Sequence, residues 1–169
     1  MSYMPTSAGS SDGGSAQGGA ALHWLQAVVE HTPDFVYVFG LDNRLLYAND
    51  ALLQMWGVAR DAAIGQDFLG LGYEPWHARM HQREIDQVRS TREPVRGEVA
   101  FSGAHGRRQY DYIFVPILGA DGAVEAVGGT TRDITDRREM EDRHAFRASL
   151  ADALRPLSDP LEEIGRAHV

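Results

Sequence analysis

The segment at residues 124–139 reads as a β-strand that runs without a loop into a charged helix. Its first half alternates in the two-residue period of a half-buried strand. Asp133, Thr135 and Asp136 follow, and each of these residue types can cap a helix. Asp136 and Glu139 also have the spacing of a capping box. A core strand fused to an exposed helix can carry a conformational change out of a domain, so this junction favours a sensor input module over an enzyme.

Three strand patterns follow one another before this junction, at residues 94–101, 108–118 and 123–131. Turn signals rich in glycine and small polar residues separate them, at residues 102–106 and 120–122. Three consecutive strands with short connections predict an antiparallel meander.

Two more strand patterns and a set of helices precede the meander. The strand patterns cover residues 35–39 and 44–48 and are joined by a turn at Asp42-Asn43. The predicted helices cover residues 49–56, 60–63 and 74–91. This order predicts an α+β domain with a five-stranded antiparallel sheet and helices packed on one face.

The domain is expected to carry extensions on both sides. Residues 1–20 consist mostly of glycine, serine and alanine, so we expect a disordered tail. Residues 21–135 would hold the domain, with an amphipathic flanking helix at residues 21–31. Residues 136–169 would form a signalling linker helix, ending near Leu154, and the start of a truncated following region. Apolar positions at helical spacing in this linker suit packing against a partner helix.

Composition excludes several classes of function. The net charge of −8 argues against nucleic-acid binding, which needs a basic surface. The absence of cysteine excludes disulfides, zinc–thiolate sites and thiol catalysis. No apolar run approaches the roughly 18 residues that a membrane span needs, and no signal peptide is visible. We therefore expect a cytoplasmic location, with no membrane contact by this segment.

The chain resembles a PAS domain with its C-terminal PAC motif, the sensory box of bacterial signalling proteins. The resemblance rests on four segments, which read PDFVYVFGLDNRLLYAND, LLQMWGVARDAAIGQDF, EPVRGEVAF and RRQYDYIFVPILGADGAVEAVGGTTRDIT. They cover about residues 25–136, and the sequence RDIT joined to a charged helix is their most specific part.

The resemblance implies a regulatory domain that is not itself an enzyme. It would provide signal input to a C-terminal output domain, such as a histidine kinase of a two-component system, in a bacterium. Asn49 would stabilise the turn after the second strand, and Asp133, beside Thr135, would hold the junction with the signalling helix. The flanking helices would form a homodimer.

Ligands in this family lie between the sheet and the long helix that precedes the meander. Alternation places Tyr110, Tyr112 and Phe114 on one face of the predicted sheet, and aromatic rings with polar tips suit a small organic ligand. The candidate pocket residues are Trp76, His77, His81, Tyr110, Tyr112 and Thr130.

His77 and His81 leave an alternative open, because residues four apart share one face of a helix. An imidazole in this place can ligate haem iron, and haem-binding PAS domains place a proximal histidine on this helix. The other interpretation is a solvated helix face beside Arg79. No other metal site is expected, since the HExxH pattern is absent. Flavin–cysteinyl chemistry is excluded by the lack of cysteine.

Three hypotheses therefore remain open from the sequence. The first is an input domain that binds a small cytoplasmic ligand or a partner protein and needs no cofactor. The second is a haem-based gas sensor that uses His81 or His77. The third is a dimerisation spacer that binds no ligand.

Overall fold

The computed structural model describes residues 13–155, which begin with the long helix α1 (Gly13–His31). We expected this helix to start at Ala21 and residues 1–20 to be disordered. Residues 13–20 instead form its first turns, and residues 1–12 lie outside the described part of the chain. A segment of glycine, serine and alanine does not form a stable helix in isolation. A helix already nucleated by residues 21–31 gains one hydrogen bond for each residue added at its end.

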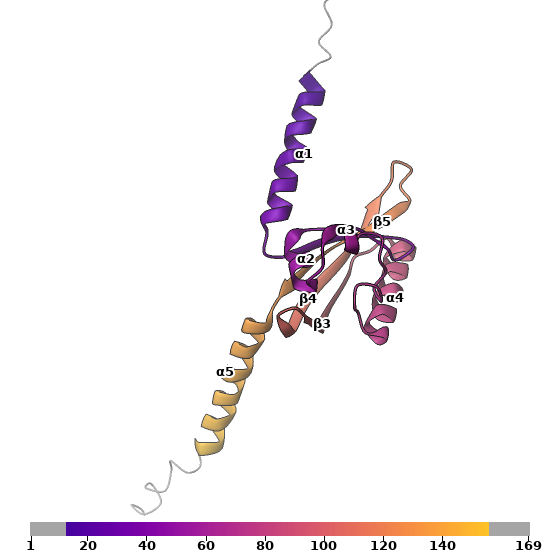
Figure 1. Ribbon diagram of the computed structural model, residues 1–169. Helices are drawn as coiled ribbons and strands as arrows, with labels where there is room; N and C mark the ends of the chain where they lie inside the picture. Colours follow the sequence, from indigo (N-terminus) through magenta and orange to yellow (C-terminus); the bar gives the residue numbers. More distant parts are fainter. Residues whose placement is uncertain (1–12, 156–169) are drawn as a thin grey trace, which may run out of the picture.

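The five strands form one antiparallel sheet, as predicted (Figure 1). They are β1 (Phe35–Gly40), β2 (Leu45–Ala48), β3 (Val95–Gly103), β4 (Gly106–Leu118) and β5 (Val124–Asp133). Their order across the sheet is β2-β1-β5-β4-β3. The last strand in the sequence therefore lies at the centre of the sheet, between the first strand and the meander.

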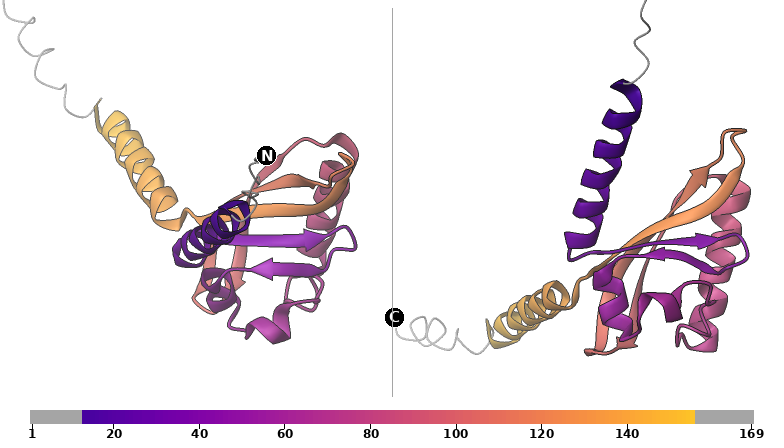
Figure 2. Two further views of the ribbon diagram at one scale, coloured as in Figure 1. Left: turned by 90° about the horizontal axis from the view of Figure 1, so that it is seen from above. Right: turned by 45° about the horizontal axis from the view of Figure 1, so that its top comes forward.

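Three helices cover one face of this sheet (Figure 2). They are α2 (Asp50–Trp56), α3 (Arg60–Ala63) and α4 (Pro75–Thr91). Gly57 ends α2 with a φ of 73°, a left-handed conformation that glycine adopts without strain. Residues 64–74 connect α3 to α4 without a regular helix or strand.

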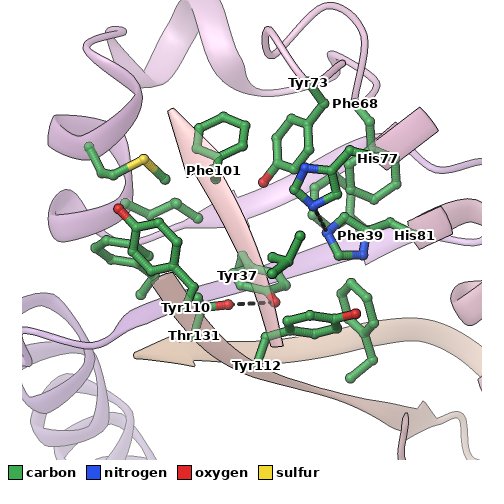
Figure 3. A pocket seen from close by; sticks show the side chains of 15 residues that line it. Tyr37, Phe39, Phe68, Tyr73, His77, His81, Phe101, Tyr110, Tyr112 and Thr131 are labelled. Atoms are coloured by element: carbon green, nitrogen blue, oxygen red, sulfur yellow. Dashed lines mark hydrogen bonds between the residues drawn. The ribbon is translucent and has the colours of Figure 1, made fainter. Parts of the chain in front are cut away.

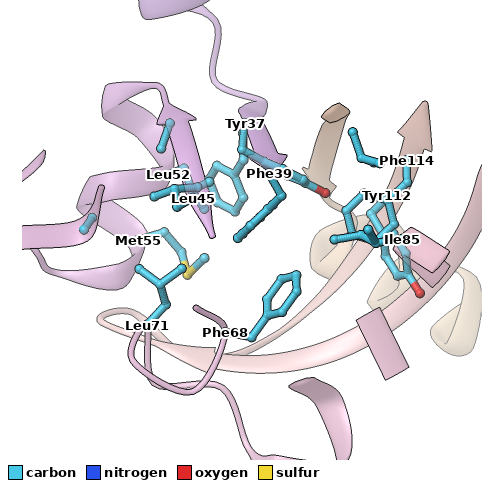
Figure 4. Packing of buried hydrophobic residues seen from close by; sticks show 14 of the residues in the cluster. Tyr37, Phe39, Leu45, Leu52, Met55, Phe68, Leu71, Ile85, Tyr112 and Phe114 are labelled. Atoms are coloured by element: carbon cyan, nitrogen blue, oxygen red, sulfur yellow. The ribbon is translucent and has the colours of Figure 1, made fainter. Parts of the chain in front are cut away.

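The hydrophobic core fills the space between the sheet and these helices (Figure 4). Phe39 and Phe68 stack near its middle, with ring centroids 4.4 Å apart. Gly129 allows the Tyr37 ring to lie flat on the sheet, since a Cβ at this position would come within 2.3 Å of that ring.

Helix α5 (Thr135–Leu154) follows β5, and both α1 and α5 extend away from the domain (Figure 1). The C-terminal end of α1 is fixed to the domain by Glu30, whose carboxylate accepts a hydrogen bond of 2.7 Å from the Tyr47 hydroxyl. Between residues 13 and 155, no helix is long and apolar enough to cross a membrane.

Candidate functional site

A small cavity of about 30 Å³ lies between the sheet and α4. A cavity needs about 10–15 Å³ to hold one water molecule, so this one has room for two or so. No Asp, Glu, Lys or Arg side chain lines it. Its wall consists of Phe35, Tyr37, Phe39, Leu52, Met55, Phe68, Tyr73, His77, His81, Val99, Phe101, Tyr110, Tyr112, Phe114 and Thr131.

His77 and His81 are buried in this wall, with exposed fractions of 2% and 5%. The Nε2 atoms of the two rings are 2.7 Å apart (Figure 3). Nδ1 of His81 lies 2.8 Å from Oε2 of Glu84, and the Tyr112 hydroxyl donates to Oε1 of the same carboxylate. The interpretation of these histidines as a solvated helix face, beside Arg79, is therefore wrong, because they face the core while Arg79 faces solvent.

The hydrogen bonds of this chain fix the tautomers of both rings. A Glu84 carboxylate only accepts, so His81 must donate to it from Nδ1 and keep Nε2 as an acceptor. His77 then donates from Nε2 to His81. This leaves Nδ1 of His77 as an acceptor with no hydrogen-bond partner among residues 13–155.

Burial keeps the His77 imidazole and three phenols of the cavity uncharged at neutral pH. Burial, and next the neighbouring His81, lower the pKa of His77 to about 4, against a weaker opposing effect of Glu84. Burial likewise raises the pKa of the Tyr37, Tyr73 and Tyr112 phenols far above their usual value. At neutral pH these phenols can donate hydrogen bonds, and His77 is a neutral imidazole.

Further hydroxyl groups reach the cavity from the sheet and from the loop before α4. Those of Tyr37 and Thr131 lie 3.0 Å apart and share a hydrogen bond. Tyr110 is only 3% exposed, and its hydroxyl makes no hydrogen bond with any described residue. The Tyr73 hydroxyl points into the middle of the cavity (Figure 3).

Four of the six predicted pocket residues line the cavity, namely His77, His81, Tyr110 and Tyr112. Trp76 does not, because its side chain is 46% exposed and its indole stacks on the outer side of His77.

Thr130 also lies outside the cavity, on the opposite face of the sheet beside Arg96. Its neighbour Thr131 takes the expected place. Thr131 lies two steps of two residues after the buried Val127, so both point to the same face of the sheet. Sequence reasoning also missed Tyr37, which lines the cavity from β1.

The residues of the cavity do not fit a haem in this arrangement. Pockets for ligands of drug size usually have about 300–1,000 Å³, and the volume here is about 30 Å³. Both ring nitrogens of His81 are engaged in hydrogen bonds, which leaves none for iron. Residues 13–155 also hold no group of three side chains suited to bind another metal.

The second candidate site is the junction between β5 and α5. Oδ1 of Asp133 accepts hydrogen bonds of 2.9 and 2.6 Å from the backbone N–H and the hydroxyl of Thr135. Oδ2 of Asp133 accepts from Arg108, and the Thr135 hydroxyl oxygen accepts from the Gln109 N–H on β4. Partial burial would raise the pKa of Asp133, but the bonds from Thr135 and the Arg108 charge outweigh it and lower this pKa.

The start of α5 differs in one respect from the prediction. The capping box of Asp136 and Glu139 does not form, and the residue that precedes the helix, Ile134, makes no side-chain capping bond. The Asp133 carboxylate binds the Thr135 N–H instead, and the helix begins at Thr135, two residues before the first helical residue that a cap at Asp136 requires.

Asn49 occupies the corner where β2 meets α2, and it is fully buried. Its Oδ1 accepts from the N–H groups of Val36 and Leu52, while Nδ2 donates to the carbonyls of Val29 and Asp34. One side chain thus joins α1, β1 and α2. The expected role of Asn49 in the turn after the second strand agrees with these four bonds.

Comparisons with known proteins agree on one family. The family model described as PAS fold matches residues 29–139. The virulence sensor protein BvgS of Bordetella pertussis is 32% identical over 123 residues, which are 70% of this chain. The chain spans about a tenth of the length of the BvgS relatives that it matches.

Solved structures give the same fold. The PAS domain of Bordetella pertussis BvgS has a TM-score of 0.59 at 25% identity, over 77% of this chain and 98% of that one. A PAS domain from Colwellia psychrerythraea has a TM-score of 0.59 at 20% identity, over 69% of this chain and 98% of that one.

Proposed function

The chain belongs to the PAS family, and from that premise we propose that it senses a small molecule for a bacterial signalling protein and relays the change through α5. The output domain would be a histidine kinase or a related signalling enzyme, and the sensing would take place in the cytoplasm. One observation carries the proposal. Thr131, in the cavity wall, and Asp133, at the base of α5, are two residues apart on the central strand β5.

The proposed relay needs two arrangements of the sheet and α5. A ligand shifts their populations only by its difference in affinity for the two. A ligand that displaces Thr131 or Tyr112 would strain the adjoining pair β4 and β5, which also hold the Asp133–Thr135 junction. The start of α5 would then tilt, and the output domain would receive that movement.

The relay can be tested with this chain fused to a histidine kinase. Thr131→Val removes the hydrogen bond to Tyr37 inside the cavity, so we expect it to change the autophosphorylation rate. Thr130→Val is the matched control, because the same change is made on the opposite face. In an Asp133→Ala background the effect of Thr131→Val should disappear, which a double-mutant cycle measures. A Thr131→Val effect of undiminished size in that background would contradict the relay.

Homodimer formation through the flanking helices is the second part of the proposal. Four apolar side chains of α1 are between 61% and 68% exposed, namely Leu22, Trp24, Leu25 and Val28. Helix α5 exposes Phe146, Leu150 and Leu154 in the same way. Contiguous exposed apolar groups of this kind mark interaction sites, and a second copy presents a surface that matches.

A dimerisation spacer without a ligand is the competing function, and the small size of the cavity favours it. Native mass spectrometry and an absorption spectrum of the purified chain separate the two. A bound small-molecule mass supports the sensor, and a Soret band would show that the cavity opens to admit haem. A dimer mass without any bound species supports the spacer.

A further inference from the structure

We propose that the cavity binds a small, uncharged, single-ring compound with one hydrogen-bonding group, which enters through an outer pocket between α4 and β3. This inference rests on the proposed sensory function and names the class of ligand. It also assigns to His77 and Phe101 the role of the inner gate.

The charge of the ligand follows from the wall of the cavity. No acidic or basic side chain lines it, and burial keeps the His77 imidazole neutral. A carboxylate, phosphate or ammonium group would lose its hydration there without gaining an ion pair, which is strongly unfavourable. Charged groups are therefore excluded from the inner cavity, whereas Glu74 and Arg107 line the outer pocket.

The shape of the ligand follows from the rings around the cavity. Tyr73 and Phe101 lie on one side, with centroids 4.7 Å apart, and Phe35 and Tyr110 lie on another at 5.5 Å. Such rings offer flat faces and edges, and they favour a planar guest in stacked or edge-on contact. A puckered ring of the same size fits these faces less well.

The hydrogen-bonding group follows from Tyr110. Tyr110 lines the cavity, and its hydroxyl makes no hydrogen bond with any described residue. A guest that bonds to this hydroxyl gains a hydrogen bond within a largely apolar wall, and therefore affinity. The Tyr37 and Thr131 hydroxyl groups already bond to each other, so a further hydrogen bond from a guest would contribute less affinity.

The route of entry follows from a second pocket, of about 130 Å³, at the surface. His77 and Phe101 line both this outer pocket and the cavity, so they form the wall between them. The two spaces have about 30 and 130 Å³, and an engineered cavity of about 150 Å³ binds benzene. If the wall moves, the joined space therefore fits one ring. Because a single hydrogen bond holds the His77 ring, entry would break the bond between His77 and His81.

The test is a titration of the 169-residue chain with phenol, benzoate and cyclohexanol, followed by NMR shifts of the backbone amides. We expect phenol to shift amides of β4 and α4, and benzoate and cyclohexanol to bind at least about tenfold more weakly. Tyr110→Phe should weaken phenol binding about fivefold, the effect of one hydrogen bond. Tyr47→Phe is the matched control, because Tyr47 bonds to Glu30 outside the cavity.

Phe101→Ala tests the gate, since it removes half of the wall between the two spaces. It should admit the larger 2-naphthol and speed the exchange of phenol. Tighter binding of benzoate than of phenol would overturn the ligand class. Failure of every probe, also with Phe101→Ala, would overturn the inference as a whole. The effect of Thr131→Val on kinase output needs no added ligand, so the proposed sensory function stands or falls separately.

Discussion

Asn49 shows how much of this fold depends on a single side chain. All four of its hydrogen-bonding positions are used, by backbone groups of α1, of the residue before β1, of β1 itself and of α2. Asn49→Ala would leave these buried backbone groups without partners, at about 1–3 kcal/mol each. We expect the free energy of unfolding, measured in urea, to fall by at least about 3 kcal/mol.

Asn43→Gly is a suitable control for that experiment. Asn43 has a φ of 64°, and its buried Oδ1 has no hydrogen-bond partner in the described chain. Glycine adopts this conformation freely and removes the unpaired oxygen, so stability should stay the same or rise slightly. Equal midpoints for Asn49→Ala and the unchanged chain would contradict the assigned role of Asn49.

His77 makes stability depend on pH. Its pKa is about 4 in the folded chain and about 6.5 when unfolded, so the unfolded state binds more protons between these values. Stability should therefore be complete above pH 6.5 and fall as the pH is lowered toward 4, by up to about 1.4 kcal/mol per pH unit.

Urea denaturation at several pH values measures this slope. His77→Gln should flatten it, while His105→Gln, at an exposed position between β3 and β4, should leave it unchanged. The two variants differ only in burial and neighbours. Equal slopes for the two variants would show that His77 titrates normally in the folded state.

At the scale of elements, the sequence predicts where the helices and strands lie, but it predicts less well which of their side chains point into the core. On α4, His77 and His81 continue the buried stripe of Ile85 and Val88 at spacings of four, four and three. This pattern is visible in the sequence, but histidine is ambiguous because it occurs both in cores and on surfaces. The hydrogen bond between the two rings could not be predicted from the sequence, since it depends on how closely the sheet approaches α4.

On β5, the residue that faces the cavity was predicted wrongly for a different reason. Thr130 and Thr131 are chemically equal, and only the phase of the strand decides which one faces the cavity. Two glycines, at positions 128 and 129, hide that phase because they have no side chain to reveal it. The start of α1 was missed because composition describes residues 13–20 and not the helix that they extend.

Thr135 provides a prediction about α5. Its hydroxyl donates to Asp133 and accepts from the Gln109 N–H, so it links the helix to both β4 and β5. With Thr135→Val, amides in the first turn of α5 should exchange with solvent about fivefold faster, the equivalent of one lost hydrogen bond.

Hydrogen exchange detected by mass spectrometry or NMR can measure this effect. The strands of the sheet should keep their protection, because their own ladder is intact. Asp136→Ala serves as the control on the same helix, since the Asp136 carboxylate makes no hydrogen bond or ion pair in the described chain. Unchanged exchange in Thr135→Val would show that the junction is held by other contacts.

At the scale of the whole molecule, the exposed apolar side chains of α1 predict a dimer in solution. Leu25→Lys would place a charge in the proposed contact, so sedimentation should show a shift from dimer toward monomer at micromolar concentration. Gln26→Lys adds the same charge at the neighbouring position of the helix and should leave the dimer in place. A monomeric unchanged chain, or equal effects of both substitutions, would contradict the proposed interface.

The chain enters and leaves this domain at one place. Phe35 at the start of β1 lies opposite Thr131 near the end of β5, and an ion pair of 2.6 Å joins the neighbours Asp34 and Arg132. Adjacent strands are roughly 5 Å apart, so the points where the chain enters and leaves the domain are separated by little more than this distance. Such a unit can be spliced into a host polypeptide, or removed from it, without forcing the host ends apart. This geometry suits a domain that is inserted or deleted as a unit during evolution, since the rest of the host protein would keep its fold.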